Sequence, residues 1–134
     1  MPPSAVEHFA YPNADQIQQE KGIKLIKGDG NITLATCDAS AQQIEVLTVQ
    51  GNGGTPQGAY CFKATAKSGY LKLELPRVFA LETADHPISA DLRPQADPSA
   101  QPETVAVAPN GYKSVGEGNG GGAPSVLLEL RVTG

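Results

Sequence analysis

Apolar and polar residues alternate along most of this chain, which is the pattern of half-buried β-strands. The clearest example is the stretch in which Leu71, Leu73 and Leu75 alternate with polar residues. Clusters of Gly, Pro, Asn and Asp separate such stretches and predict turns between them. The predicted strands are residues 23–27, 32–37, 44–49, 59–66, 70–75, 77–81, 88–93, 104–108, 112–115 and 126–132. In the last strand, the residues expected to face the core are Val126, Leu128, Leu130 and Val132.

Many short strands without regular strand–helix alternation predict a mostly β fold, an antiparallel β-sandwich or partly open barrel. Residues 23–27 and 32–37 flank Gly28-Asp29-Gly30-Asn31, whose residue types favour a tight turn, so these two strands are expected to form a hairpin. Residues 13–134 are predicted to form a single domain, preceded by an extended N-terminal arm at residues 1–12.

One short helix is expected at about residues 14–21, before the first predicted strand. Asn13 is a residue type that caps helix N-termini, and Gln16 stands three residues later, as in a capping box. Gly22 can adopt the left-handed conformation that ends a helix. The segment has few apolar residues, so the helix is expected to lie on the surface.

Cys37 and Cys61 are the two cysteines of the chain. In a small, glycine-rich β-domain they are expected to form a disulfide, which favours an exported protein over a cytosolic one. The bond would tie the predicted hairpin to strand 59–66 across strand 44–49. The other interpretation is two unrelated buried thiols.

Composition and charge exclude several partners and locations. The formal net charge is −4 and basic residues form no cluster, so nucleic acid is not an expected partner. No apolar stretch approaches the roughly 20 residues that span a bilayer, so membrane insertion is not expected. The first residues, Met1 to Ser4, lack the features of a signal peptide, and any such peptide is expected to have been removed from this sequence.

Two motifs resemble ligand sites in their letters. Residues 116–121 match G-x-G-x-x-G, but a strand follows where a dinucleotide site requires a helix, so no cofactor is predicted. His8 and His86 would form a metal site only if the fold brought them together with Asp85 or Glu82. Solvated surface imidazoles are the favoured interpretation, and no metal is predicted.

Asp85, His86 and Ser89 are the one local group that could support nucleophilic catalysis. No nucleophile-elbow motif accompanies them, and Asp and Ser are ordinary turn residues. A small hydrolase is therefore an interpretation that ranks below non-enzymatic ones.

Three stretches carry a resemblance to known proteins: KGIKLIKGDGNITLATC at residues 21–37, GYLKLELP at 69–76 and SVLLELRV at 125–132. Over about residues 13–134 the chain resembles small exported proteins of Streptomyces-type actinobacteria, most of which have no assigned activity. Some of these serve as adaptor subunits of secreted assemblies and join other subunits through an N-terminal extension. The resemblance therefore implies an extracellular, non-enzymatic protein.

We expect a secreted protein-interaction module that contacts another secreted or cell-surface protein. Phe9 and Tyr11 in the arm are candidate anchors for such a partner. The turn at residues 83–88 and the glycine-rich loop at 116–124 are further candidate contacts, through Asp85, His86, Glu117 and Asn119, the side chains proposed there for binding. The alternative is a protease inhibitor that inserts one of these two loops into a protease cleft.

Overall fold

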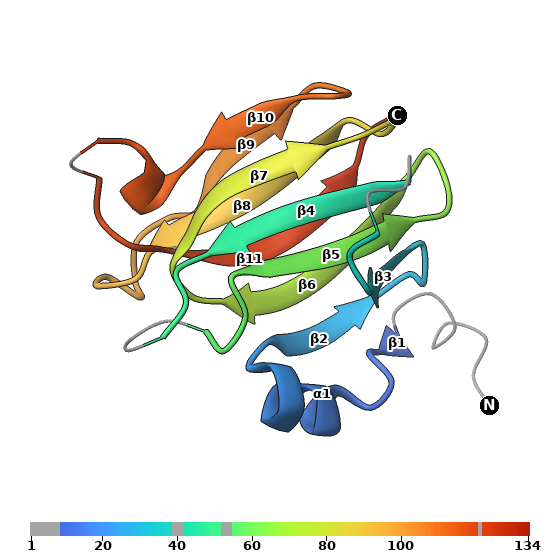
Figure 1. The fold of residues 1–134 in the computed structure, drawn as a ribbon, viewed down its shortest axis with the longest axis horizontal. Helices are drawn as coiled ribbons and strands as arrows, with labels where there is room; N and C mark the ends of the chain where they lie inside the picture. The colour runs from blue at the N-terminus through green and yellow to red at the C-terminus, as the bar shows by residue number, and fades with distance from the viewer. Residues whose placement is uncertain (1–8, 39–41, 52–54, 121) are drawn as a thin grey trace.

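The computed structural model describes residues 9–38, 42–51, 55–120 and 122–134, and shows a β-sandwich of two antiparallel sheets (Figure 1). The predicted fold class is confirmed. Sheet A consists, in spatial order, of β1 (Phe9–Ala10), β2 (Lys24–Gly28), β6 (Gly69–Leu75), β11 (Ser125–Val132), β8 (Ile88–Pro94) and β9 (Glu103–Val107). Sheet B consists of β10 (Tyr112–Ser114), β7 (Val78–Thr83), β4 (Gln43–Thr48), β5 (Ala59–Ala64) and β3 (Ile32–Ala35).

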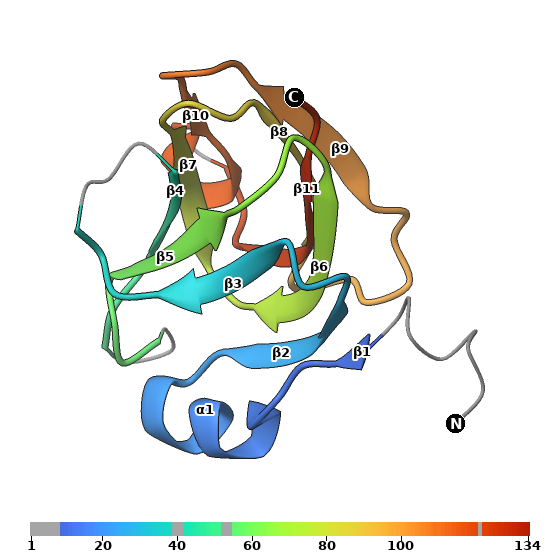
Figure 2. The same cartoon turned by 90° about the vertical axis from the view of Figure 1, so that its right-hand side faces the viewer.

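The core lies between the two sheets, which face each other in Figure 2. Leu71, Leu73 and Leu75 of β6 are all fully buried, as their alternation predicts. Most of the other core residues are Ile, Leu and Val, and Tyr60 and Phe62 are the largest fully buried side chains. Burial of this aliphatic surface is the main stabilisation of the sandwich.

Helix α1 (Ala14–Lys21) has the predicted bounds. Gly22 ends it in the left-handed conformation, with φ 72°, and donates its N–H to the carbonyl of Gln18. The predicted capping box is wrong: Asn13 is itself left-handed and makes no side-chain cap hydrogen bond, while Gln16 donates to Glu20 on the next turn. The helix has no buried residue, and Ile17 is its contact with the core.

The predicted hairpin between β2 and β3 is wrong, because the two strands belong to different sheets. The turn between them crosses from sheet A to sheet B and is held by side chains: Asp29 Oδ1 accepts the N–H groups of Asn31 and Tyr70, at 3.0 and 3.3 Å. Asn31 Nδ2 donates to the carbonyl of Ser68 at 3.1 Å. These bonds join the turn to the β5–β6 connection, which crosses between the same two sheets.

Part of the expected arm is a strand of the sandwich. Ala10 of β1 pairs with Lys27 of β2, and the N–H of Tyr11 donates to the carbonyl of Ile26. The Tyr11 hydroxyl accepts a hydrogen bond from the backbone N–H of Leu34, at 2.8 Å, on the open edge of sheet B. Tyr11 is partly buried and packs against the protein's own core, and its expected role as a partner anchor stays a prediction. Residues 1–8 of the arm lie outside the described residues.

The predicted disulfide between Cys37 and Cys61 is confirmed, with the Cα atoms 5.1 Å apart. Its expected place in the sheet is wrong. Strand β3 lies directly beside β5, with Ala35 opposite Cys61, and β4 is on the other side of β5. The bond therefore fastens the edge strand β3 to its neighbour, and a loop of 24 residues closed in this way contributes about 3–4 kcal/mol in the chain-entropy model.

A β-bulge changes the predicted core face of β11. The register shifts between Leu127 and Glu129, so the residues before the bulge face the opposite way from the predicted alternation. Leu127 is fully buried, whereas Val126 and Leu128 are only partly buried. The prediction is correct after the bulge, where Leu130 and Val132 are buried.

No helix in the described part of the chain is long and apolar enough to cross a membrane.

The bulge gives a test on two adjacent leucines. Leu127→Ala removes a fully buried side chain and should reduce the free energy of unfolding by about 2–5 kcal/mol. Leu128→Ala, the matched control, should reduce it by no more than about 1 kcal/mol, since Leu128 lies partly in solvent. Urea unfolding followed by circular dichroism measures both values. Equal losses, or a larger loss for Leu128→Ala, would contradict the position of the bulge.

Candidate functional site

On the outer face of sheet A, acidic side chains are paired with basic ones. Arg131 holds Asp91 through two hydrogen bonds, Nη2–Oδ1 at 2.7 Å and Nη1–Oδ2 at 3.0 Å, and also contacts Glu129 at 2.7 Å. Lys72 approaches Glu129 at 4.0 Å. The guanidinium of Arg131 lowers the pKa of Asp91 below its ordinary value. In this network the charges of Asp91 and Glu129 on the outer face of sheet A are balanced by Arg131 and Lys72.

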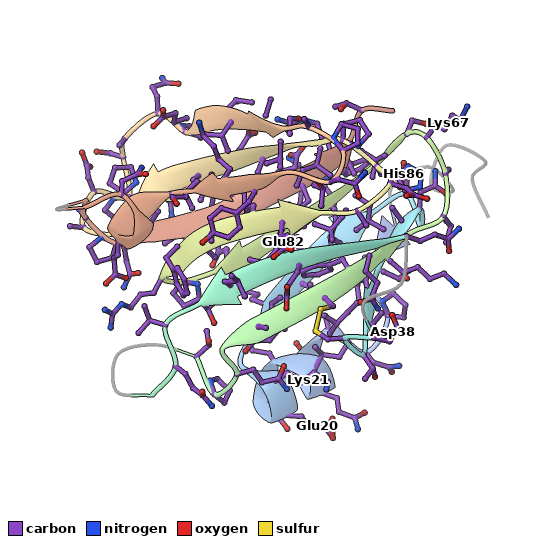
Figure 3. All side chains as sticks on the ribbon, turned by 45° about the horizontal axis from the view of Figure 1, so that its top comes forward. Glu20, Lys21, Asp38, Lys67, Glu82 and His86 are labelled. Carbon is purple, nitrogen blue, oxygen red and sulfur yellow. A yellow bond between two sulfur atoms is a disulfide. The ribbon has the colours of Figure 1, made fainter. Side chains whose placement is uncertain are left out.

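The outer face of sheet B carries a different arrangement. Tyr112 of β10 lies opposite Glu82 of β7, Glu82 lies opposite Glu45 of β4, and Glu45 lies opposite Cys61 of β5. Directly opposed residues of an antiparallel sheet point to the same face, so these four side chains form a row across four strands. We call it the cross-strand row. Glu82 is exposed at the front of the molecule in Figure 3, and Tyr112 has 58% of its surface in solvent.

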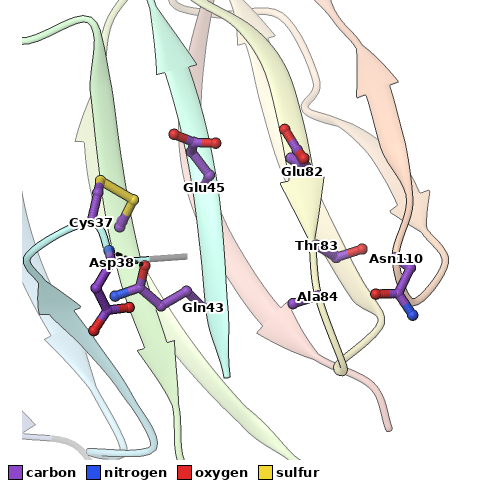
Figure 4. A pocket seen from close by; sticks show the side chains of 9 residues that line it. Cys37, Asp38, Gln43, Glu45, Glu82, Thr83, Ala84 and Asn110 are labelled. Carbon is purple, nitrogen blue, oxygen red and sulfur yellow. Dashed lines mark hydrogen bonds between the residues drawn. A yellow bond between two sulfur atoms is a disulfide. The ribbon is translucent and has the colours of Figure 1, made fainter. Parts of the chain in front are cut away.

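A hollow of about 490 Å³ lies over this face (Figure 4). Its lining residues come from β4, β5, β7 and the segments beside them: Cys37, Asp38, Gln43, Glu45, Cys61, Glu82, Thr83, Ala84 and Asn110. Gln43 is only 8% exposed. Its Nε2 donates to the carbonyl of Thr36 and its Oε1 accepts the N–H of Asp38, so it holds the segment around Cys37 at one side of the hollow. The disulfide and Glu45 are drawn side by side in the close-up.

The two glutamates of the cross-strand row lack a basic partner within the described ranges: no ion pair there involves Glu45 or Glu82. Lys63 is exposed on the same face, opposite Gln43 and one row away. Like charges directly opposite each other destabilise a sheet. Glu45 and Glu82 on sheet B therefore lack ion pairs like those that Asp91 and Glu129 form on sheet A.

The hollow also contains one potential group of metal ligands. The Sγ atoms of Cys37 and Cys61 and a carboxylate oxygen of Glu45 all lie within 4.8 Å of one another. In the disulfide the sulfur atoms carry no thiolate charge, and thiolates are the form in which cysteine binds metals. In this oxidised state the group is a disulfide flanked by a carboxylate.

The metal site considered for the histidines includes His8, so only its described members, His86, Asp85 and Glu82, can be placed. His86 Nδ1 lies 2.8 Å from the carbonyl oxygen of Gly134, and His86 belongs to no ligand group within the part of the chain described. His8 lies outside the described residues. Asp85 is exposed on the same turn as His86, and Glu82 lies in the cross-strand row.

The hydrolase group is not assembled. Ser89 Oγ accepts a hydrogen bond from Nε of Arg131 at 3.0 Å on the outer face of sheet A. His86 is directed to Gly134, and among the described residues no hydrogen bond joins it to Ser89 or Asp85. In this structure His86 and Ser89 therefore hydrogen-bond to Gly134 and Arg131 and not to each other, whereas this mechanism requires a base beside the nucleophile.

The glycine-rich loop is packed against sheet B at residues 116–118, which form the short 3-10 helix η2 (Gly116–Gly118). Glu117 forms a bidentate ion pair with Arg77, at 2.6 and 2.9 Å, which lowers the pKa of the Glu117 carboxyl. A Cβ at Gly118 would clash with the carbonyl oxygen of Phe79, so glycine is required for this close contact. Of the two proposed contact residues, Glu117 is engaged internally and Asn119 is exposed.

The cross-strand row was missed from the sequence. In the sequence, Glu45 and Tyr112 are only members of the predicted strands 44–49 and 112–115, and Glu82 is only a possible metal ligand. The available signal was the succession of strands 44–49 and 59–66, because adjacent antiparallel strands place Glu45 opposite Cys61. The pairing of β4 with β7, which brings Glu82 beside Glu45, joins strands that are not consecutive and left no local signal.

In comparisons with known proteins, no family model matches this chain, and neither does any curated protein sequence.

The sheet A network gives a prediction on pH. Asp91→Asn removes a partly buried bidentate ion pair and should lower the free energy of unfolding by about 1–2 kcal/mol at neutral pH, between the values for exposed and buried pairs. Because the folded-state pKa of Asp91 lies below its ordinary 3.8, the stabilisation is present above that value and is lost as the pH falls through the folded pKa. Urea unfolding at several pH values should show wild type and variant converging in acid. A constant difference would contradict this role.

The sheet B face gives a prediction of opposite sign. Glu82→Gln removes a like-charge contact with Glu45 and should raise the free energy of unfolding by about 0.2–1 kcal/mol. Glu74→Gln is the matched control, since Glu74 pairs with Lys24 on sheet A and its loss should leave stability unchanged or slightly lower. Thermal unfolding at low ionic strength measures the difference. A destabilised Glu82→Gln would mean that Glu82 has a stabilising partner.

Proposed function

We propose that this protein is a non-enzymatic protein-interaction module whose binding surface is the outer face of sheet B. The ligand is a cationic side chain, Arg or Lys, presented by a partner protein. The observation that carries the proposal is the pair of opposed glutamates, Glu45 and Glu82, which lack a basic partner among the described residues and lie in a hollow of about 490 Å³.

Charge and shape both favour this ligand. Two carboxylates on neighbouring strands, about 5 Å apart at their Cβ atoms, can accept hydrogen bonds from one guanidinium or ammonium group. Tyr112 stands next to Glu82 in the same row, is well exposed, and offers an aromatic face on which a cation can stack. A bound cation would also relieve the repulsion between the two glutamates.

The contrast between the two sheets supports the same conclusion. On sheet A, Arg131, Lys72 and Lys24 neutralise the neighbouring carboxylates within the protein. On sheet B the nearest described lysine of the face, Lys63, lies opposite Gln43, and no described cation pairs with Glu45 or Glu82. Their opposition costs some stability, and such a cost is typical of residues that serve binding.

The proposed location is extracellular. The disulfide favours an oxidising compartment, and the resemblance to small exported actinobacterial proteins implies the same. The partner would then be another secreted or cell-surface protein. An additional contact through the arm at residues 1–12, with Phe9 and Tyr11 as its anchors, stays a prediction, and β1 (Phe9–Ala10) attaches the arm to sheet A.

A binding experiment with defined peptides tests the proposal. The probe is a fluorescein-labelled Gly-Arg-Gly-Arg-Gly peptide, and the control peptide has citrulline, which is uncharged and nearly isosteric, in place of arginine. Fluorescence anisotropy should show binding of the arginine peptide that weakens with salt, and no binding of the citrulline peptide. Glu45→Gln and Glu82→Gln should each weaken binding about tenfold or more, as expected for loss of a charged hydrogen bond.

Glu20→Gln provides the matched control, because it makes the same change of charge on the exposed face of α1. It should bind the arginine peptide like the wild type. Equal affinities of wild type, Glu45→Gln and Glu82→Gln, or an equal loss in Glu20→Gln, would contradict a site on sheet B.

A protease inhibitor is a second candidate, favoured by the bracing of the turn at residues 83–88. Asn110 donates its N–H to the carbonyl of Ala84 at 2.7 Å, and Thr133 donates to that of Pro87 at 3.0 Å. A loop held in one conformation loses little entropy when it enters a cleft. Inhibition of a trypsin-like or subtilisin-like protease at micromolar protein, abolished by substitution of His86, would support this function over the first.

A further inference from the structure

We propose that reduction of the Cys37–Cys61 disulfide creates a binding site for a divalent cation of the zinc group, with Cys37, Cys61 and Glu45 as its protein ligands. The site is distinct from the proposed peptide-binding function, since it is absent from the oxidised protein and requires no partner. It uses the one group of ligand atoms within the described ranges that lies close enough for a single metal ion.

The geometry is suited to a tetrahedral metal. Zinc binds thiolate sulfur at about 2.3 Å and carboxylate oxygen at about 2.0–2.2 Å, so ligand atoms around one ion lie roughly 3.5–4 Å apart. The two sulfurs and the Glu45 oxygen lie within 4.8 Å of one another. Glu45 and Cys61 are fixed by direct pairing of β4 and β5, which makes two of the three ligands part of a rigid sheet.

In the reduced site the two sulfur atoms must move apart to bind one metal ion, and Cys37 is the cysteine that can move. It lies beyond the end of β3 and is exposed, whereas Cys61 is 3% exposed within β5. Once the bond between the sulfurs is broken, rotation of the Cys37 side chain separates them without disturbing the sheet. Gln43 donates a hydrogen bond to the carbonyl of Thr36 and accepts one from the N–H of Asp38, which keeps the backbone on either side of Cys37 near the site.

The electrostatics of the hollow favour a cation. Glu45 has no competing basic partner in the part of the chain described, and Glu82 faces it from β7. The negative charge of the neighbouring carboxylate attracts a divalent ion. The fourth coordination position is left to a water molecule or to Glu82, which lines the same hollow.

The redox step is an ordinary disulfide reduction. Two equivalents of a thiol, or one dithiol, break the Cys37–Cys61 bond, transfer two electrons and two protons, and leave two protein thiols and the oxidised disulfide of the reductant. Metal binding then releases the two thiol protons, because cysteine coordinates as thiolate. The site therefore exists under reducing conditions and disappears on oxidation.

The test uses the full-length protein and Cd²⁺, a close chemical relative of zinc whose thiolate complexes absorb in the ultraviolet. A water-soluble phosphine reduces the disulfide and is itself converted to the phosphine oxide, and a mass increase of about 2 Da confirms the two thiols. Titration should then give a cadmium–thiolate band that saturates at one equivalent. The oxidised protein and Cys37→Ser/Cys61→Ser should give none.

Glu45→Gln identifies the third ligand. It should weaken Cd²⁺ binding at least tenfold. Loss of a residue that only hydrogen-bonds to a metal ligand already weakens metal binding by about 10–100-fold, and Glu45 is proposed as a ligand itself. Glu20→Gln, with the same loss of charge on α1, should bind like the wild type. Absence of the band in the reduced wild type, or an unchanged affinity in Glu45→Gln, would overturn the proposal.

Reduction removes a cross-link, so circular dichroism must accompany the titration. If the reduced protein loses its strand signal, Cd²⁺ should restore it at one equivalent in the wild type, because the metal replaces the cross-link between β5 and the end of β3. Failure to restore the signal would overturn the proposal. Peptide binding is measured on the oxidised protein, so each result is independent of the other.

Discussion

Burial of aliphatic side chains between two antiparallel sheets is the constraint on which the rest of this structure depends. The chain has no Trp and only three Phe, so many Ile, Leu and Val residues must meet between the sheets to exclude water. The weak points of a sandwich are its edge strands. Here the edge strand β3 is secured twice, by the disulfide from Cys37 to Cys61 and by the Tyr11 hydroxyl, which accepts the N–H of Leu34.

With the inner faces committed to the core, function is left to the outer faces, and these differ. Sheet A neutralises its charges through Arg131 and two lysines, so a partner would have to break ion pairs to bind there. Sheet B leaves Glu45 and Glu82 opposed, next to an exposed Tyr112. The two outer faces thus differ in charge pairing: the acidic side chains named on sheet A are ion-paired, and Glu45 and Glu82 on sheet B are not. The disulfide lies on the outer face of sheet B, which links the chemistry of the cysteines to that of the glutamates.

The sequence predicted the elements better than their partners. Helix α1 and most strand bounds followed from local patterns, because alternation and turn residues act over a few positions. The β2–β3 hairpin failed because a Gly-Asp-Gly-Asn turn serves a crossing between sheets as well as a hairpin. The crossing is stabilised by Asp29, which accepts a hydrogen bond from the N–H of Tyr70, a residue distant in sequence. The core face of β11 failed at Leu127 because a bulge adds one residue that no local pattern marks.

The candidate site was hidden for the same reason. Each residue of the cross-strand row is an ordinary strand position by itself, and the row exists only through the pairings of β10, β7, β4 and β5. Tyr11 is a related case, since the sequence gives no sign that its hydroxyl accepts a hydrogen bond from Leu34 on the edge of sheet B.

The claim that the outer face of sheet B binds cationic side chains is tested most directly by two-dimensional NMR of the ¹⁵N-labelled, oxidised protein during addition of the arginine peptide. We expect amide shift changes concentrated at Glu45, Cys61, Glu82 and Tyr112, with the amides of β8 and β11 unchanged. Shift changes spread evenly over both sheets, or confined to sheet A or α1, would contradict it.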